Sequence, residues 1–185
     1  PMIYGGMRPA RLRPLVHLEG FGLPSSAAPQ APTRYARWLD ELRTTAGLLD
    51  DADLDAVARR LCANNPRLAP ERAAWLAPHW ARRTPAGRWA ILGDPAHKRI
   101  NPQLYRVDEV LACWARIAAP VLWVEGRQTD IEKWWSAPYP RSEFEQRIAT
   151  VARLERVVLD DAGHMVHHDQ PEALARELAR FLDAP

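Results

Sequence analysis

The sequence contains few cysteines and no long apolar run. Only 2 of the 185 residues are cysteine. Cys62 and Cys113 lie in helical patterns without CxxC spacing, so we expect two reduced, packed thiols and not a disulfide or a metal site. No apolar segment approaches the length needed to cross a bilayer. The N-terminus lacks the charged and apolar regions of a signal peptide, and we therefore expect a cytoplasmic location.

The chain also lacks a block of like charge. The formal net charge is +2 and the pI is about 8.9. Arginines are scattered through helical patterns, which is typical of solvated helix faces, so we expect neither a nucleic acid nor a membrane as partner. The abundant residues are 17 prolines and 8 tryptophans. The prolines should divide the middle of the chain into short helices, and the tryptophans should line or fill their core.

The last thirty residues predict a strand, a polar loop and a helix. A β-branched run at 157–159 predicts a buried strand. Apolar residues recur at helical spacing over 174–182, and Asp169 with Glu172 forms a capping-box pattern. Between strand and helix, a glycine precedes His164. A histidine at the carboxyl end of a strand can act as a general acid or base.

Two further strands are expected upstream. One covers residues 15–19, and the other covers 121–125 and leads into a turn that runs to Asp130. Residues 33 to about 118 are predicted to be almost wholly helical, in short amphipathic helices without β-alternation. A Pro/Gly-rich passage that includes residues 89–97 and 101–105 is too irregular to assign. Residues 1–7 look like the end of a helix that begins before this chain.

Two segments resemble the α/β-hydrolase family. Asp-Ala-Gly-His164-Met-Val-His-His-Asp-Gln-Pro-Glu resembles its catalytic-histidine loop, and Pro120-Val-Leu-Trp-Val-Glu-Gly-Arg-Gln-Thr-Asp130 is similar to its penultimate strand with the acid-bearing turn. The resemblance implies an α/β fold, the C-terminal portion of an α/β-hydrolase with about three strands plus flanking helices and an inserted helical cap. Residues 1–24 and 119–185 would form the partial core, and residues 25–118 the cap.

The resemblance also implies the roles of the site residues. His164 would be the general base, and Asp130 the carboxylate that orients it and stabilises the imidazolium. Glu19, which ends the strand at 15–19, is a rival acid, although we expect it to have a structural role. Without the resemblance, Asp130 could equally be an N-cap and His164 a packed loop residue.

Two other interpretations concern residues near these motifs. Residues 164–169 contain three histidines and an aspartate, but they lie mostly in a loop and have no partner Cys or Glu at matched spacing. We therefore expect no metal and no cofactor. Trp134 and Trp135 could wall a substrate pocket or pack the cap onto the core.

The nucleophile of such an enzyme is missing from this sequence. It should lie on a G-x-S-x-G elbow, or on the same elbow with Asp in place of Ser. No such pentapeptide occurs, and none of the four serines lies between glycines. The chain is therefore predicted to be a C-terminal fragment that is inactive alone, with the missing N-terminal half of the fold as a partner.

The predicted activity of the whole enzyme is hydrolysis of an ester or a similar small apolar substrate. With an Asp nucleophile, the same cap, acid and histidine would serve a haloalkane dehalogenase or an epoxide hydrolase. A different class also remains open. The chain could be a noncatalytic binding module derived from the cap, or half of a two-chain assembly.

Overall fold

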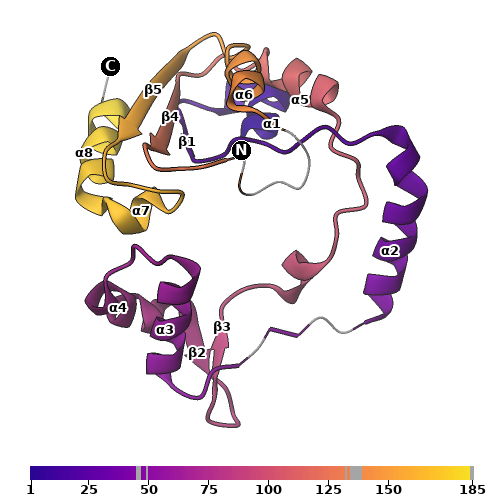
Figure 1. Cartoon of the computed structure of the whole chain (residues 1–185). Coiled ribbons are helices and arrows are strands. Elements are labelled where there is room, and N and C mark those ends of the chain that lie inside the picture. Colours follow the sequence, from indigo (N-terminus) through magenta and orange to yellow (C-terminus); the bar gives the residue numbers. More distant parts are fainter. Residues whose placement is uncertain (45–46, 49, 132, 134–138, 184–185) are drawn as a thin grey trace. The chain divides into compact units, whose positions relative to one another are not determined.

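The structure is a computed structural model that describes residues 1–44, 47–48, 50–131, 133 and 139–183. It divides into two units (Figure 1). The first consists of Pro1–Ser26 and Tyr105–Pro185, and the second of Ala27–Leu104. The division predicted from sequence lies at residues 24/25 and 118/119, so the two assignments differ mainly in residues 105–118.

The first unit is built on a three-stranded parallel sheet. Its strands, in the order β1-β4-β5, are β1 (Leu15–Leu18), β4 (Val121–Gly126) and β5 (Leu154–Leu159). In register, Leu15 lies opposite Val121, and Val121 opposite Leu154. Strand β4 is buried along its whole length, as expected for a central strand of a parallel sheet covered on both faces. All three strands were predicted from sequence, within three residues at each end.

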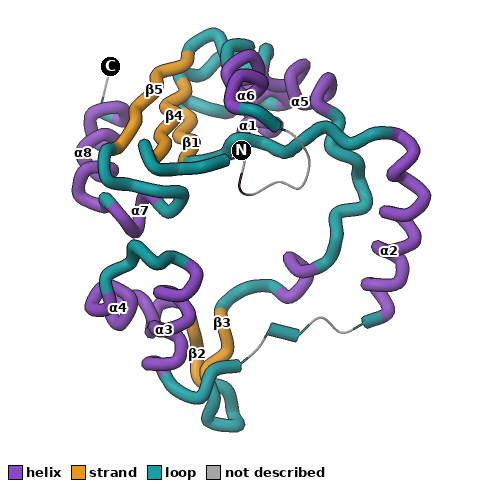
Figure 2. Tube along the Cα trace, in the orientation of Figure 1, coloured by secondary structure: helices purple, strands orange, loops and turns teal. Residues whose placement is uncertain are grey.

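Helices cover both faces of this sheet (Figure 2). Val121 and Trp123 face a core formed with α1 (Met2–Met7), α5 (Val107–Trp114) and α6 (Arg141–Ile148). Leu122 and Val124 face the opposite core, formed with α7 (Val166–Asp169) and α8 (Pro171–Leu182). The alternation along β4 therefore assigns successive side chains to two separate cores.

Helix α5 belongs to the first unit, whereas the sequence analysis assigned it to the cap. Its buried residues Val110 and Trp114 pack with Met2 of α1 in one core cluster. The two helices approach closely, because a Cβ on Gly6 would lie 1.9 Å from the carbonyl oxygen of Cys113. The apolar periodicity predicted the helix correctly, but periodicity does not show which partner the apolar face meets.

Among its described residues, the second unit has three α-helices, two short 3₁₀ helices (Ala28–Gln30 and Pro95–Lys98) and one β-hairpin. The elements are α2 (Ala31–Arg43), α3 (Leu54–Asn64), α4 (Pro70–Trp80), β2 (Ala81–Arg83) and β3 (Trp89–Ile91). Buried residues of α3, α4 and the hairpin form its two small cores, whereas α2 buries no side chain. Among the described helices of either unit, none is long and apolar enough to span a membrane.

The hairpin was not predicted: the middle segment was expected to be almost wholly helical, and the passage that contains β3 was left unassigned. Strands β2 and β3 pair antiparallel, and the backbone of Asp51 bridges to Trp89 on the outer side of β3. Strands of three residues are too short to show the alternation that marks a strand in sequence. Pro78 lies inside α4, near its end at Trp80.

Candidate active site

His164 and Glu19 meet at the carboxyl end of the parallel sheet. His164 lies in the loop between β5 and α7, and Glu19 directly follows β1. Nδ1 of His164 lies 3.1 Å from Oε2 of Glu19, and the side chains are 41% and 3% exposed, respectively. The pair therefore combines a buried carboxylate with an imidazole that reaches the surface.

The turn after β4 holds the other oxygen of Glu19. Oε1 accepts hydrogen bonds from the backbone N–H of Gly126 and from Oγ1 of Thr129, the latter at 3.0 Å. Glu19 itself has a φ of +56°, which is uncommon for a residue other than glycine. Such backbone strain gathers at functional sites, where the surrounding contacts maintain it.

The segment that follows Glu19 is anchored to the first unit. The hydroxyl of Tyr139 donates to the carbonyl of Phe21 at 2.8 Å, and burial raises the pKa of Tyr139 to about 12, so that this donor keeps its proton. Nε2 of His17 lies 3.0 Å from the carbonyl oxygen of Gly20. Burial lowers the pKa of His17, which favours the neutral ring at this contact.

The histidine loop is tied to the turn after β4. The N–H of Gln128 donates to the carbonyl of Ala162 at 2.9 Å. A Cβ on Gly126 would lie 2.4 Å from that same oxygen and 2.5 Å from the carbonyl oxygen of Gly163, so glycine is needed for this close approach. Oδ2 of Asp169 accepts from the N–H of Gly163 at 2.8 Å. Asp169 thus braces the loop, and the structure shows no side-chain cap at the start of α8, where the sequence predicted a capping box.

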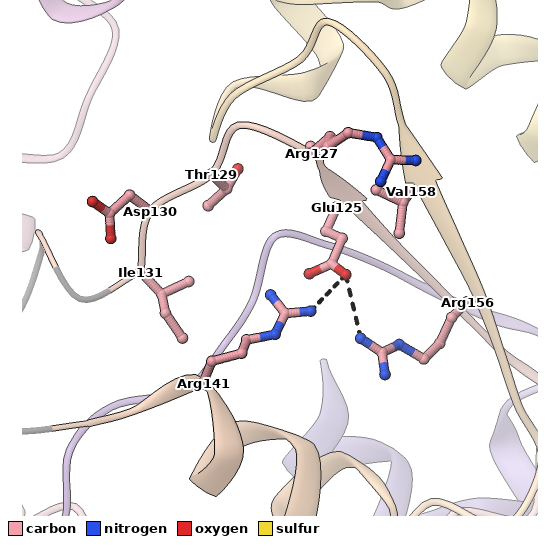
Figure 3. A pocket seen from close by; sticks show the side chains of 9 residues that line it. Glu125, Arg127, Thr129, Asp130, Ile131, Arg141, Arg156 and Val158 are labelled. Carbon is pink, nitrogen blue, oxygen red and sulfur yellow. Dashed lines mark hydrogen bonds and ion pairs between the residues drawn. The ribbon is translucent and has the colours of Figure 1, made fainter.

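Asp130, the acid expected from sequence, lies in the turn after β4 and is exposed. It lines a cavity of about 530 Å³ together with Ile131 and Arg141 (Figure 3). The carboxylate on Nδ1 of His164 is that of Glu19, the rival that we expected to be structural. Glu19, at Nδ1 of His164, is therefore a candidate for the acid beside Asp130.

The same cavity contains a network of ion pairs around a buried carboxylate. Oε1 of Glu125 accepts from Nη2 of Arg141 at 2.7 Å and of Arg156 at 3.3 Å (Figure 3). Both arginines also pair with Glu145 of α6. The network joins β4, α6 and β5.

The other histidines of the loop do not form a metal centre with His164. His167 and His168 belong to α7, with ring centroids 4.2 Å apart, and burial lowers the pKa of His167. In the part of the chain that the structure describes, no three His, Cys, Asp or Glu side chains are grouped to hold a metal ion. Trp134 and Trp135 lie outside the described residues.

Comparisons with known proteins find similarity in structure. No family model matches the chain, and no curated protein matches it. A thioesterase domain from the curacin biosynthetic pathway is similar to this chain, with a TM-score of 0.74 and 22% identity. The match covers 97% of this chain and 62% of the thioesterase domain. A hypothetical protein of Pseudomonas aeruginosa PAO1 matches 99% of the chain and 63% of its own, with a TM-score of 0.76 and 20% identity.

An esterase of Mycobacterium tuberculosis gives a similar result. It matches 99% of the chain and 58% of its own, with a TM-score of 0.67 and 18% identity. The chain thus spans about three fifths of the length of these solved structures. At such identities the likeness concerns the fold.

Proposed function

We propose that this chain, which has the α/β-hydrolase fold over about three fifths of the length of the structures it matches, carries the histidine and the acid of a catalytic triad. The observation that carries the proposal is the 3.1 Å contact between Nδ1 of His164 and Oε2 of Glu19. A carboxylate on Nδ1 holds the proton there. Nε2 is then the nitrogen that takes a proton from the nucleophile and returns it to the leaving group.

The environment of the pair suits this role. The carboxylate of Glu19 is buried and accepts hydrogen bonds from Gly126 and Thr129. A fixed negative charge beside Nδ1 stabilises the imidazolium that forms during proton transfer. The partly exposed ring of His164 remains accessible to a reacting group.

The nucleophile of the proposed triad would come from outside these 185 residues, because the sequence contains no elbow motif. Strand β1 is an outer strand of the parallel sheet, and we propose that the missing strands add at its outer edge. The second unit, Ala27–Leu104, would act as the cap. Asp130 remains the alternative acid.

The proposed reaction of the complete protein is hydrolysis of an ester or thioester with a small apolar acyl group. Solved structures that share the fold include a thioesterase domain and an esterase. Enzymes of both kinds transfer an acyl group to water. An Asp at the elbow would instead direct the same His164 to a haloalkane or an epoxide. The cytoplasmic location stays a prediction.

The experiment starts from the natural coding sequence around Pro1. The complete product and the 185-residue chain are each assayed with p-nitrophenyl butyrate, a butyryl thioester and 1-chlorobutane, and each is treated with a serine-directed fluorophosphonate. We expect turnover and a single labelled serine in the complete product only. A His164→Ala variant that keeps the full rate of the complete product would contradict the proposal.

A second candidate function is a noncatalytic binding module. Apolar side chains of the second unit are exposed, among them Trp75 at 66%, Leu92 at 57% and Leu39 at 54%, and a contiguous patch of such side chains would serve as an interaction surface. In this case Trp75→Ala would abolish association with a separately encoded polypeptide. His164→Ala would leave the association intact.

A further inference from the structure

We infer that Thr129 is a positioning residue, whose hydroxyl holds the carboxylate of Glu19 in the orientation that Nδ1 of His164 requires. The inference rests on the proposed function, because it concerns the acid of that triad. Oγ1 of Thr129 lies 3.0 Å from Oε1 of Glu19, across 110 residues of sequence. Thr129 is half-buried.

The two oxygens of Glu19 have separate tasks. Oε1 accepts from the N–H of Gly126 and from the hydroxyl of Thr129, and Oε2 contacts His164. The terminal torsion of a glutamate is broad, so a carboxylate with one donor on Oε1 can turn its plane. Two donors on one oxygen restrict that rotation and keep the other oxygen directed at the imidazole.

The backbone places both donors. The N–H of Thr129 donates to the carbonyl of Gly126 at 3.1 Å, which closes a turn, and the N–H of Arg127 donates to Leu159 of β5 at 2.9 Å. The turn is thus fixed against the strand that leads to His164. Threonine is β-branched and therefore stiff at χ1, which limits the positions of its hydroxyl.

This arrangement gives the turn after β4 a different task from the one expected from sequence. The turn was predicted to supply the acid, through Asp130. In the structure, Gly126 at the end of β4 and Thr129 in the turn donate to a carboxylate that follows the end of β1. Thr129 is the side-chain donor of the two, so its contribution can be removed by substitution without altering the backbone.

The test compares Thr129→Val, which keeps the shape and removes the donor, with Thr129→Ser, which restores the donor. Thr150→Val is the matched control, because it removes a hydroxyl that donates to the carbonyl of Arg147 at 2.8 Å. The first readout is the solvent-exchange lifetime of the Nδ1 proton of His164 in the 185-residue chain labelled with ¹⁵N-histidine. Six histidines give a simple spectrum, and His164→Ala assigns the signal.

We expect Thr129→Val to shorten that lifetime about tenfold, because the unrestrained carboxylate releases the proton to water more often. Thr129→Ser and Thr150→Val should stay within about twofold of the parent. In the complete hydrolase, Thr129→Val should lower kcat by about ten- to a hundredfold, with KM within about threefold and recovery in Thr129→Ser.

Two results would overturn the inference. The Nδ1 proton of His164 could be undetectable in the parent chain, or its lifetime could be the same in Thr129→Val as in the parent. A Thr129→Ser variant as impaired as Thr129→Val would also overturn it, since this result would indicate a purely structural role. If the complete protein hydrolyses none of the substrates but the proton still responds to Thr129→Val and recovers with serine, the proposed function fails and the positioning role stands.

Discussion

Exchange of Glu19 for glutamine separates the charge of this residue from its shape. In the variant, the side-chain oxygen can still accept from Gly126 and Thr129, as Oε1 does now. The amide NH₂ then faces Nδ1 of His164, which lies 3.1 Å from the present Oε2. The amide NH₂ and an Nδ1–H cannot donate to each other. Nδ1 must therefore become an acceptor, and the ring proton moves to Nε2. That tautomer cannot act as the base.

The expected loss in kcat of the complete hydrolase is about 10²- to 10⁴-fold, equivalent to about 3–5 kcal/mol of transition-state stabilisation. The free energy of unfolding should change by less than about 1.5 kcal/mol, because the donors that face Oε1 keep their partner. Initial rates with p-nitrophenyl butyrate measure the first quantity, and urea unfolding of the same preparation measures the second.

Asp130→Asn is the matched control for the same loss of charge. Asp130 is exposed, and an exposed substitution of this kind should alter kcat by less than about threefold. A larger loss in Asp130→Asn than in Glu19→Gln would refute the reasoning and return the role of the acid to Asp130. Equal and small losses in both variants would show that no carboxylate assists His164.

Three further predictions concern the scaffold. Gly126→Ala would bring a Cβ within 2.4 Å of the carbonyl oxygen of Ala162, and we expect it to lower the free energy of unfolding by about 1–3 kcal/mol in urea, as for other overpacked sites. Burial lowers the pKa of His17 from its ordinary 6.5. The unfolded chain therefore binds a proton below about pH 6.5 that the folded chain does not, so stability falls as the pH decreases. His17→Gln should make that fall shallower, and an unchanged slope would exclude His17 as its source. Leu122 is 0% exposed, and Leu122→Ala should cost about 2–5 kcal/mol in thermal or urea unfolding. Leu182, which is 54% exposed, should tolerate alanine with a loss below about 1 kcal/mol; similar losses at both positions would contradict the assignment of the core.

Local patterns predicted much of the first unit. The apolar run at 157–159 predicted a strand, and this run is part of β5. The expectation that the strand is buried was wrong at Val158, which is 40% exposed, whereas β4 is buried at every position. The helical spacing over 174–182 predicted α8, whose buried residues are Leu174 and Phe181. Each of these signals lies within one element, where side-chain periodicity reports directly on secondary structure.

Features that depend on contacts between distant residues were predicted less well. The periodicity of α5 could not show that its apolar face meets α1 instead of the helices of the second unit. The hairpin of β2 and β3 was missed because each strand has three residues. Asp169 matches a capping box in sequence, but its carboxylate binds Gly163 in the preceding loop.

By itself, the sequence determined the strands of the parallel sheet, the helix that follows the histidine loop, and His164 as the candidate base. The contact between Glu19 and His164 was decided by tertiary structure. Glu19 and His164 are 145 residues apart, and their contact requires β1 and β5 to end at the same edge of the sheet. It also requires a left-handed backbone at Glu19 and two donors from the turn after β4. None of these conditions is local, because each arises only when the three strands align in one sheet.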